Sequence, residues 1–136
     1  MKTLANMAFL FLLPLLAVAV AGCGAADSTG ASAAAERLYA AYTERDGATA
    51  CETLTEATRE QLVEDEQMPC EEAVLSLKLT GEKAADTSAF ITEAKVDLDG
   101  GDSVFVEETP DGWRVSAAGC EPVPDQEAPY ECEVES

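Results

Sequence analysis

The most chemically distinctive side chains of this chain are five cysteine thiols, in a sequence of 136 residues that contains no histidine. A thiol can bind a metal, form a disulfide or carry a covalently attached group. Without histidine, the commonest general base and the commonest zinc ligand are missing. Ser-His-Asp and Cys-His catalytic mechanisms are therefore excluded. No Cys-x-x-Cys pair of the kind found in zinc sites occurs among Cys23, Cys51, Cys70, Cys120 and Cys132.

Cys23 follows a leader that is typical of export. A short basic start precedes an apolar run over residues 4–20 and a pair of small residues. The stretch Val20-Ala21-Gly22-Cys23 resembles a bacterial lipobox, in which the thiol takes a diacylglyceryl group and a peptidase cuts before it. The resemblance implies a leader over 1–22 and a protein anchored by lipid on Cys23 to the extracytoplasmic face of the cell membrane. Two alternatives stay open: a secreted protein cut near Ala21, and an uncleaved membrane helix, for which the run with Pro14 is short.

The other four cysteines form an even set once Cys23 is assigned to the anchor. In an exported domain, such a set indicates two disulfides with three connectivities open. We predict Cys51–Cys70 and Cys120–Cys132, the pairings closest in sequence. Because each bridge lowers the entropy of the unfolded chain, each is expected to stabilise the folded domain by about 3 kcal/mol. A metal site is the disfavoured alternative, and we predict neither a metal nor a cofactor.

The charge balance narrows the class of partner. The chain has 8 basic and 27 acidic residues, for a net charge of −19. Such a surface repels nucleic acid and anionic lipid headgroups, so a nucleic-acid-binding function is excluded. We interpret the negative charge as a means of keeping the protein soluble at the cell envelope. The alternative is that the charge attracts cations or a basic partner.

Helical spacing follows a small-residue stretch, 23–32, which we predict to be a flexible linker before a domain over 33–136. Ser32 is expected to cap the first helix, and Gly47 to end it. The apolar face of this helix comprises Ala35, Leu38, Tyr39 and Tyr42. Asp46 or Thr49 can begin a second helix, and Thr55 a third over 56–63. After Cys70 we predict a short fourth helix that ends before Gly81, with a strand through Leu75, Leu77 and Leu79 as the alternative.

From about Ser88 the hydrophobic period changes to two. This predicts a long strand over 88–98 and further strands over 103–108 and 113–117, joined by hairpin turns at 99–102 and 109–112. Trp113, Val115 and Ala117 are expected to face one way. The helices must cover the apolar face of this sheet, so we predict an α+β domain with helices packed on a curved antiparallel sheet. The acidic, Pro-rich tail, 120–136, would be disordered unless Cys120–Cys132 holds it.

Asp-Gly-Trp-Arg-Val at 111–115, on a late strand after a glycine-containing hairpin, resembles the NTF2-like (SnoaL-like, cystatin-like) superfamily. The chain is also similar to small actinobacterial lipoproteins. That similarity spans most of the mature chain, in 38–42, 51–55 with Arg59, 69–74, 112–115 through 119–120, and 129–132. The resemblance implies a cone of helices on a curved sheet. It implies no activity, because this fold hosts enzymes, binding domains and adaptors alike.

Enzymes of this superfamily work in the mouth of the cone, and ketosteroid isomerases pair an Asp base with a Tyr and a protonated Asp. Here Asp97, Asp99 and Asp102 lie at or near a hairpin end, where acids are ordinary turn residues. The spacing of Asp97, Asp99 and Glu108 matches that of a calcium-binding loop only poorly. We therefore predict no catalytic residue and no metal ligand.

The residues that could line a pocket are aromatic: Tyr39, Tyr42, Phe90 and Trp113. The alternative is that all four are core. We predict a non-enzymatic binding or interaction module of the cell envelope, whose sheet face contacts an envelope protein or a second copy, with a filled interior and an exposed apolar patch. A carrier or sensor of a small apolar ligand would instead have an empty cavity, and an isomerase- or lyase-like enzyme an acid of raised pKa within it.

Overall fold

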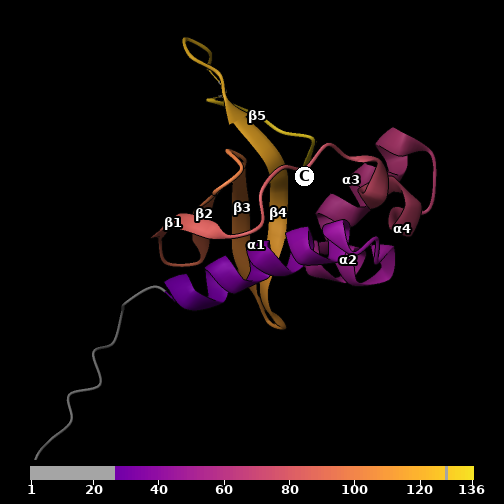
Figure 1. Ribbon diagram of the computed structural model, residues 1–136, viewed down its shortest axis with the longest axis horizontal. Coiled ribbons are helices and arrows are strands. Elements are labelled where there is room, and N and C mark those ends of the chain that lie inside the picture. The colour runs from indigo at the N-terminus through magenta and orange to yellow at the C-terminus, as the bar shows by residue number, and fades with distance from the viewer. Residues whose placement is uncertain (1–26, 128) are drawn as a thin grey trace, which may run out of the picture.

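Four helices precede an antiparallel sheet and pack on one of its faces, which confirms the α+β prediction (Figure 1). The computed structural model describes residues 27–127 and 129–136, so the predicted leader and Cys23 lie outside the described residues. The helices are α1 (Ser28–Thr43), α2 (Gly47–Thr53), α3 (Glu56–Glu66) and α4 (Cys70–Ala73), with a 3-10 turn at Val74–Ser76.

The sheet is open, with the order β1-β2-β3-β4-β5 and with β6 also paired to β4. Its strands are β1 (Ala84–Ala89), β2 (Glu93–Leu98), β3 (Ser103–Thr109), β4 (Gly112–Pro122), β5 (Tyr130–Glu131) and β6 (Val134–Glu135). The predicted hairpin turns at 99–102 and 109–112 are confirmed, because Asp97 pairs with Ser103 and Thr109 with Gly112 across them.

The first helix begins before the predicted boundary at residue 33. Asp27, rather than Ser32, is its N-cap, and its Oδ1 accepts a hydrogen bond of 2.9 Å from the Gly30 N–H. Residues 28–32, which we predicted to belong to a flexible linker, are therefore helical. An aspartate caps a helix as well as a serine does, and the alanine-rich sequence that follows favours helix.

The junction between α1 and α2 also differs from the prediction. Arg45 takes the left-handed conformation after α1, with φ of 62°, whereas Gly47 is the first residue of α2. A side chain at Gly47 would collide with the carbonyl oxygen of Glu71, so close packing against α4 explains this glycine. The caps predicted for α2 and α3 are confirmed: Asp46 accepts from the Thr49 N–H, and Thr55 from the Thr58 N–H.

The single strand predicted over 88–98 is wrong. The chain reverses at residues 90–92, where the Phe90 N–H donates to the Glu93 carbonyl at 2.7 Å, and the two halves pair as β1 and β2. Neither Gly, Pro nor Asn marks this turn, and the apolar alternation continues through it. The predicted helix after Cys70 is likewise shorter, because α4 and the 3-10 turn end at Ser76.

A β-bulge corrects the predicted orientation of Ala117. Val106 pairs with Val115, but Phe105 pairs with Ala117, so Ser116 is one extra residue on β4. An extra residue reverses the side-chain alternation beyond it. Ala117 therefore lies beside Phe105 on the face opposite Val115.

Both predicted disulfides, Cys51–Cys70 and Cys120–Cys132, are present. The first joins α2 to α4. The second holds the C-terminal tail against β4, where β5 pairs with Glu121 and Pro122, and β6 with Ala117 and Ala118. The tail thus extends the sheet, which the sequence did not predict.

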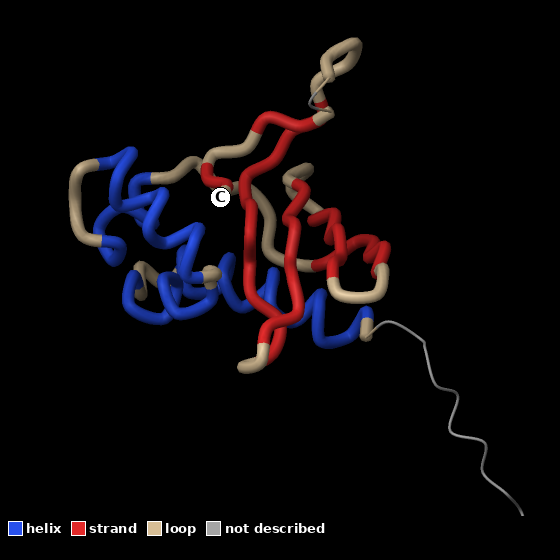
Figure 2. Tube along the Cα trace, turned by 180° about the vertical axis from the view of Figure 1, so that it is seen from behind, coloured by secondary structure: helices blue, strands red, loops and turns tan. Residues whose placement is uncertain are grey.

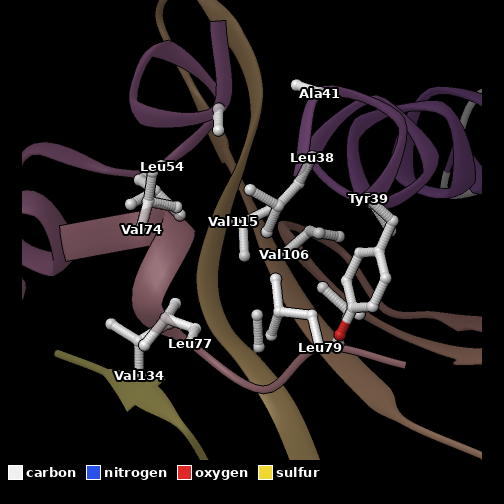
Figure 3. Packing of buried hydrophobic residues seen from close by; sticks show 14 of the residues in the cluster. Leu38, Tyr39, Ala41, Leu54, Val74, Leu77, Leu79, Val106, Val115 and Val134 are labelled. Carbon is white, nitrogen blue, oxygen red and sulfur yellow. The ribbon is translucent and has the colours of Figure 1, made fainter. Parts of the chain in front are cut away.

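The space between the helices and the sheet is filled by side chains from both layers (Figure 3). Leu38 of α1 and Leu54 after α2 meet Val106 and Val115 of the sheet, and all four are at most 2% exposed. Figure 3 shows Tyr39 reaching from α1 into the same layer, with its hydroxyl near Leu79. In the part of the chain that the structure describes, every buried side-chain nitrogen and oxygen has a hydrogen-bond partner.

Candidate functional site

The structure does not bring the four predicted pocket residues together around a cavity. Tyr39 is 1% exposed within the core, and the half-buried Tyr42 donates a 2.6 Å hydrogen bond to the Leu77 carbonyl. Trp113 is half-buried against the start of α1. Phe90 lies in the β1–β2 turn and is 64% exposed. The first three therefore pack in or against the core, and only Phe90 reaches the surface freely.

The buried polar centre of the domain is a cluster made by Tyr39, Thr80, Asp102 and Gly119. The Tyr39 hydroxyl donates to Asp102 Oδ2 at 2.9 Å and accepts from the Gly119 N–H at 3.1 Å. Thr80 donates its N–H to Asp102 Oδ2 at 2.8 Å and its hydroxyl to Oδ1 at 2.7 Å. Burial, together with the nearby Asp102 carboxylate, raises the pKa of Tyr39 above its ordinary value.

This Tyr39–Asp102 cluster holds α1, the segment before β1 and the sheet together. Asp102 is 3% exposed, and both of its oxygens are engaged by side chains or backbone of the chain itself. A catalytic acid or base must reach a substrate proton, and this carboxylate has no open side. We predicted Asp102 to be an ordinary turn residue, and its place directly before an apolar strand is the local sign of its burial.

A second group of side chains, mostly charged or aromatic, lies on the face of the sheet turned away from the helices. We call this the outer face and define it by Lys95, Asp97, Phe105, Ala117 and Tyr130. Cross-strand pairing places Lys95 beside Phe105 and Phe105 beside Ala117. Figure 2 shows this face from behind, with β3 and β4 in front of the helices. Over the described residues, no helix packs on it.

The aromatic rings of the outer face form a small ordered group. Phe105 and Tyr130 meet edge to face, with 5.1 Å between ring centroids. The Lys95 ammonium lies 5.8 Å from the centre of the Tyr130 ring and donates to its hydroxyl at 3.4 Å. Such contacts fix two large side chains in place, although both remain partly accessible.

Asp97 completes this group through charge. Its Oδ2 accepts a 2.8 Å bond from Lys95, and its Oδ1 accepts from the Ser103 hydroxyl. Burial acts to raise the pKa of Asp97, but the hydrogen bonds from Lys95 and Ser103 outweigh it and hold the pKa below its ordinary value. The hydrogen bond to Asp97 in turn raises the pKa of Lys95. Both groups are therefore charged at neutral pH, and the pair is locally neutral.

Two shallow hollows flank Phe105 on this face. One, of about 290 Å³, lies toward Phe90 and Lys95, and the other, of about 400 Å³, lies toward Tyr130 and the C-terminus. A larger hollow of about 530 Å³ lies elsewhere, between α3 and the β3–β4 hairpin. Its charged lining is mixed and mostly acidic: Glu52, Glu56, Arg59, Glu107, Asp111 and Arg114. We therefore regard it as a solvated polar groove.

Two further features concern residues 27–127 and 129–136 as a whole. No group of three His, Cys, Asp or Glu side chains there is arranged to hold a metal ion. No helix in those ranges is long and apolar enough to cross a membrane.

Comparisons of the chain with protein-family models, with curated proteins and with solved structures found no match. The features left for a functional proposal are the outer face, the exposed β1–β2 turn and, from the sequence alone, the predicted anchor at Cys23. Sequence reasoning singled out Phe90 and Cys23 among these, but it missed Lys95, Phe105 and the packing of Tyr130 on Phe105. The pairing of β2, β3 and β5 that unites these three comes from contacts far apart in sequence.

Proposed function

We propose that this protein is a lipid-anchored component of the bacterial cell envelope that acts as a non-enzymatic interaction module through its outer face. The observation that carries this proposal is the ordered Lys95–Phe105–Tyr130 group on a sheet face that no described helix covers. Rigid, half-buried aromatic side chains beside a cation are typical of the energetic centres of protein interfaces. The partner is an envelope protein or a second copy of this chain.

The filled interior supports an interaction module over a carrier. A carrier of a small apolar ligand needs a concave cavity, commonly of about 300–1,000 Å³. The hollows of about 290, 400 and 530 Å³ lie at the surface and are open, whereas the space between the helices and the sheet is filled. An isomerase- or lyase-like role would need a reachable acid, whereas Asp102 is enclosed and fully hydrogen-bonded.

We also propose that the domain is related to the NTF2-like superfamily. The order of elements, with helices before a meander of antiparallel strands, supports this relation, as does Trp113-Arg114 following a glycine-containing hairpin. The sheet of this chain is open, so a closed cone is not part of the proposal.

The anchor is the first part of the proposal to test. Replacing Cys23 by serine removes the thiol that would carry the lipid, and we expect the protein to move from the membrane to the soluble fraction. Two acyl chains hold a protein on a bilayer far more strongly than surface contacts do. Ultracentrifugation after a high-salt wash measures this. A Cys23→Ser protein that stays in the membrane fraction would show that the lipobox interpretation is wrong.

The interaction surface is tested by site-specific crosslinking in native membranes. We expect a photoreactive phenylalanine analogue at Tyr130 to give one discrete adduct, and Lys95→Ala in the same protein to reduce its yield, because the Lys95 ammonium lies over the ring at position 130. The matched control carries the analogue at Val63 of α3, which is exposed but lies away from the outer face.

The mass of the adduct identifies the occupant. Twice the mass of the chain indicates a second copy, and any other single mass indicates a different envelope protein. The same adducts from Tyr130 and Val63, or none from Tyr130, would contradict an interaction surface at the outer face.

A further inference from the structure

The turn between β1 and β2 exposes two large apolar side chains in succession. Ile91 is 89% exposed and Phe90 is 64% exposed. The one other large apolar residue that is exposed within the described residues is Val63, at 40%. Single apolar residues on a surface need no explanation, but an adjacent pair at the tip of a turn presents a compact apolar projection.

Contacts along one edge of the molecule place this turn at the same end as the start of α1. The indole of Trp113 lies against Gly30, where an added Cβ would be 2.7 Å from Trp113 Cδ1. Trp113 pairs with Glu108 across the β3–β4 hairpin. The Glu108 N–H donates to the Thr92 carbonyl at 2.8 Å. The N-terminal end of α1, the β3–β4 hairpin and the β1–β2 turn are therefore neighbours.

The predicted anchor at Cys23 precedes this end by only a few residues in the sequence. Asp27 caps α1, so only four peptide units separate the start of the folded domain from Cys23. Four fully extended residues span at most about 14 Å. A lipid on Cys23 would thus hold the β1–β2 turn near the headgroup layer, which is about 5–8 Å thick on each side of the bilayer.

The distribution of charge favours the same orientation. Residues 28–35 of α1 and residues 87–92 around the turn carry no charged side chain, in a chain of which 26% is charged. Helix α3 has five acidic residues and one arginine. Figure 1 shows α3 and α4 at the opposite end of the long axis from the start of α1. An anionic membrane surface would repel the acidic α3 and tolerate the uncharged tip at 87–92, although Glu108 and Asp111 of the β3–β4 hairpin lie on the same end as that tip.

We propose that the β1–β2 turn seats the domain on the lipid bilayer, with Phe90 and Ile91 inserted at the headgroup level beside the anchor. At a membrane interface, the apolar face of an amphipathic segment is buried to a depth of about 5–10 Å, at the boundary between headgroups and acyl chains. This inference rests on the proposed lipid anchor. It leaves Tyr130 and the hollow toward the C-terminus free for a partner, whereas Phe90 of the turn also lines the hollow beside Lys95 and Phe105.

The test is bromine quenching of a single indole in the full-length, lipidated protein. Trp113 is the sole tryptophan of the chain, so Trp113→Phe gives a background without indole. Ile91→Trp in that background places the indole at the tip, and Val63→Trp places it on α3 as the matched control. Both proteins are reconstituted into vesicles of phosphatidylcholine and phosphatidylglycerol, with and without brominated acyl chains. Thermal unfolding of each variant confirms that it is folded.

We expect brominated lipid to remove most of the emission of the indole at position 91 and to leave that at position 63 nearly unchanged. Equal quenching at the two positions, in protein that floats with the vesicles, overturns the seating while leaving the anchor in place. Blue-shifted emission at position 91 without quenching also overturns it, and indicates that a protein surface covers the turn. Protein that does not float with the vesicles overturns both the anchor and the seating.

Discussion

Replacing Asp102 by alanine is expected to lower the free energy of unfolding by about 3 kcal/mol, out of the about 5–15 kcal/mol that stabilises a typical domain. The side chain is 3% exposed and accepts hydrogen bonds from the Tyr39 hydroxyl and from both donors of Thr80. Alanine would leave the Tyr39 O–H inside the core without an acceptor, and a buried unpaired donor costs about 1–3 kcal/mol. Urea unfolding followed by circular dichroism measures the loss.

Asp99 of the same turn is the matched control. It accepts hydrogen bonds from the Glu82 and Lys83 N–H groups, but it is exposed, so water can replace it. We expect Asp99→Ala to destabilise the domain far less than Asp102→Ala. Asp102→Asn, which keeps one acceptor oxygen, should recover part of the loss. Equal effects of alanine at positions 99 and 102 would contradict the central role of the Tyr39–Asp102 cluster.

Removal of the Cys51–Cys70 disulfide by the double change Cys51→Ala and Cys70→Ala is expected to cost about 3 kcal/mol. The bridge closes a segment with a sequence separation of 19 and ties α2 to α4. Without the bridge, the conformational entropy of the unfolded chain is higher, and this favours unfolding. Thermal unfolding of the oxidised proteins should therefore show a clearly lower midpoint for the variant.

The second disulfide provides the comparison for this result. Cys120→Ala with Cys132→Ala opens a segment with a separation of 12 and also frees the tail that carries β5 and β6. We expect rapid proteolysis of the tail in this variant only, because its backbone would lose the pairing with β4. An unchanged unfolding midpoint after loss of Cys51–Cys70 would rule out a stabilising role for that bridge.

Features with a local chemical cause were predictable from the sequence. Asp46 and Thr55 cap helices because their side chains accept from an N–H three residues ahead. The Gly-containing turns at 99–102 and 109–112 reverse the chain as predicted, because glycine tolerates the backbone angles that such turns need. The two disulfides join the cysteines nearest in sequence. The same local information places Cys23 at the end of an export leader, which stays a prediction.

Features that depend on distant contacts were decided by the tertiary structure alone. The reversal at residues 90–92 has no turn residue to announce it, and it forms because both halves gain pairing in the sheet. The extra residue at Ser116 moves Ala117 to the outer face, since the register of β3 against β4 fixes which side chains share a face. In the sequence, Asp102 has the features of an ordinary turn residue. Its role in the core depends on the hydrogen bond from Tyr39 of α1, which lies 63 residues earlier in the chain.

The amino-acid sequence by itself thus predicted the α+β class, the helices before the strands and the pairing of the cysteines nearest in sequence, and it excluded histidine chemistry. Each of these follows from composition, short spacing or loop length. Only the tertiary structure decided that Tyr39 is core, that Phe105 and Tyr130 share the outer face, and that Ile91 is exposed in a turn at the same end as the start of α1. The physical reason is that burial and surface are properties of packed elements, and these elements meet through contacts that no local pattern encodes.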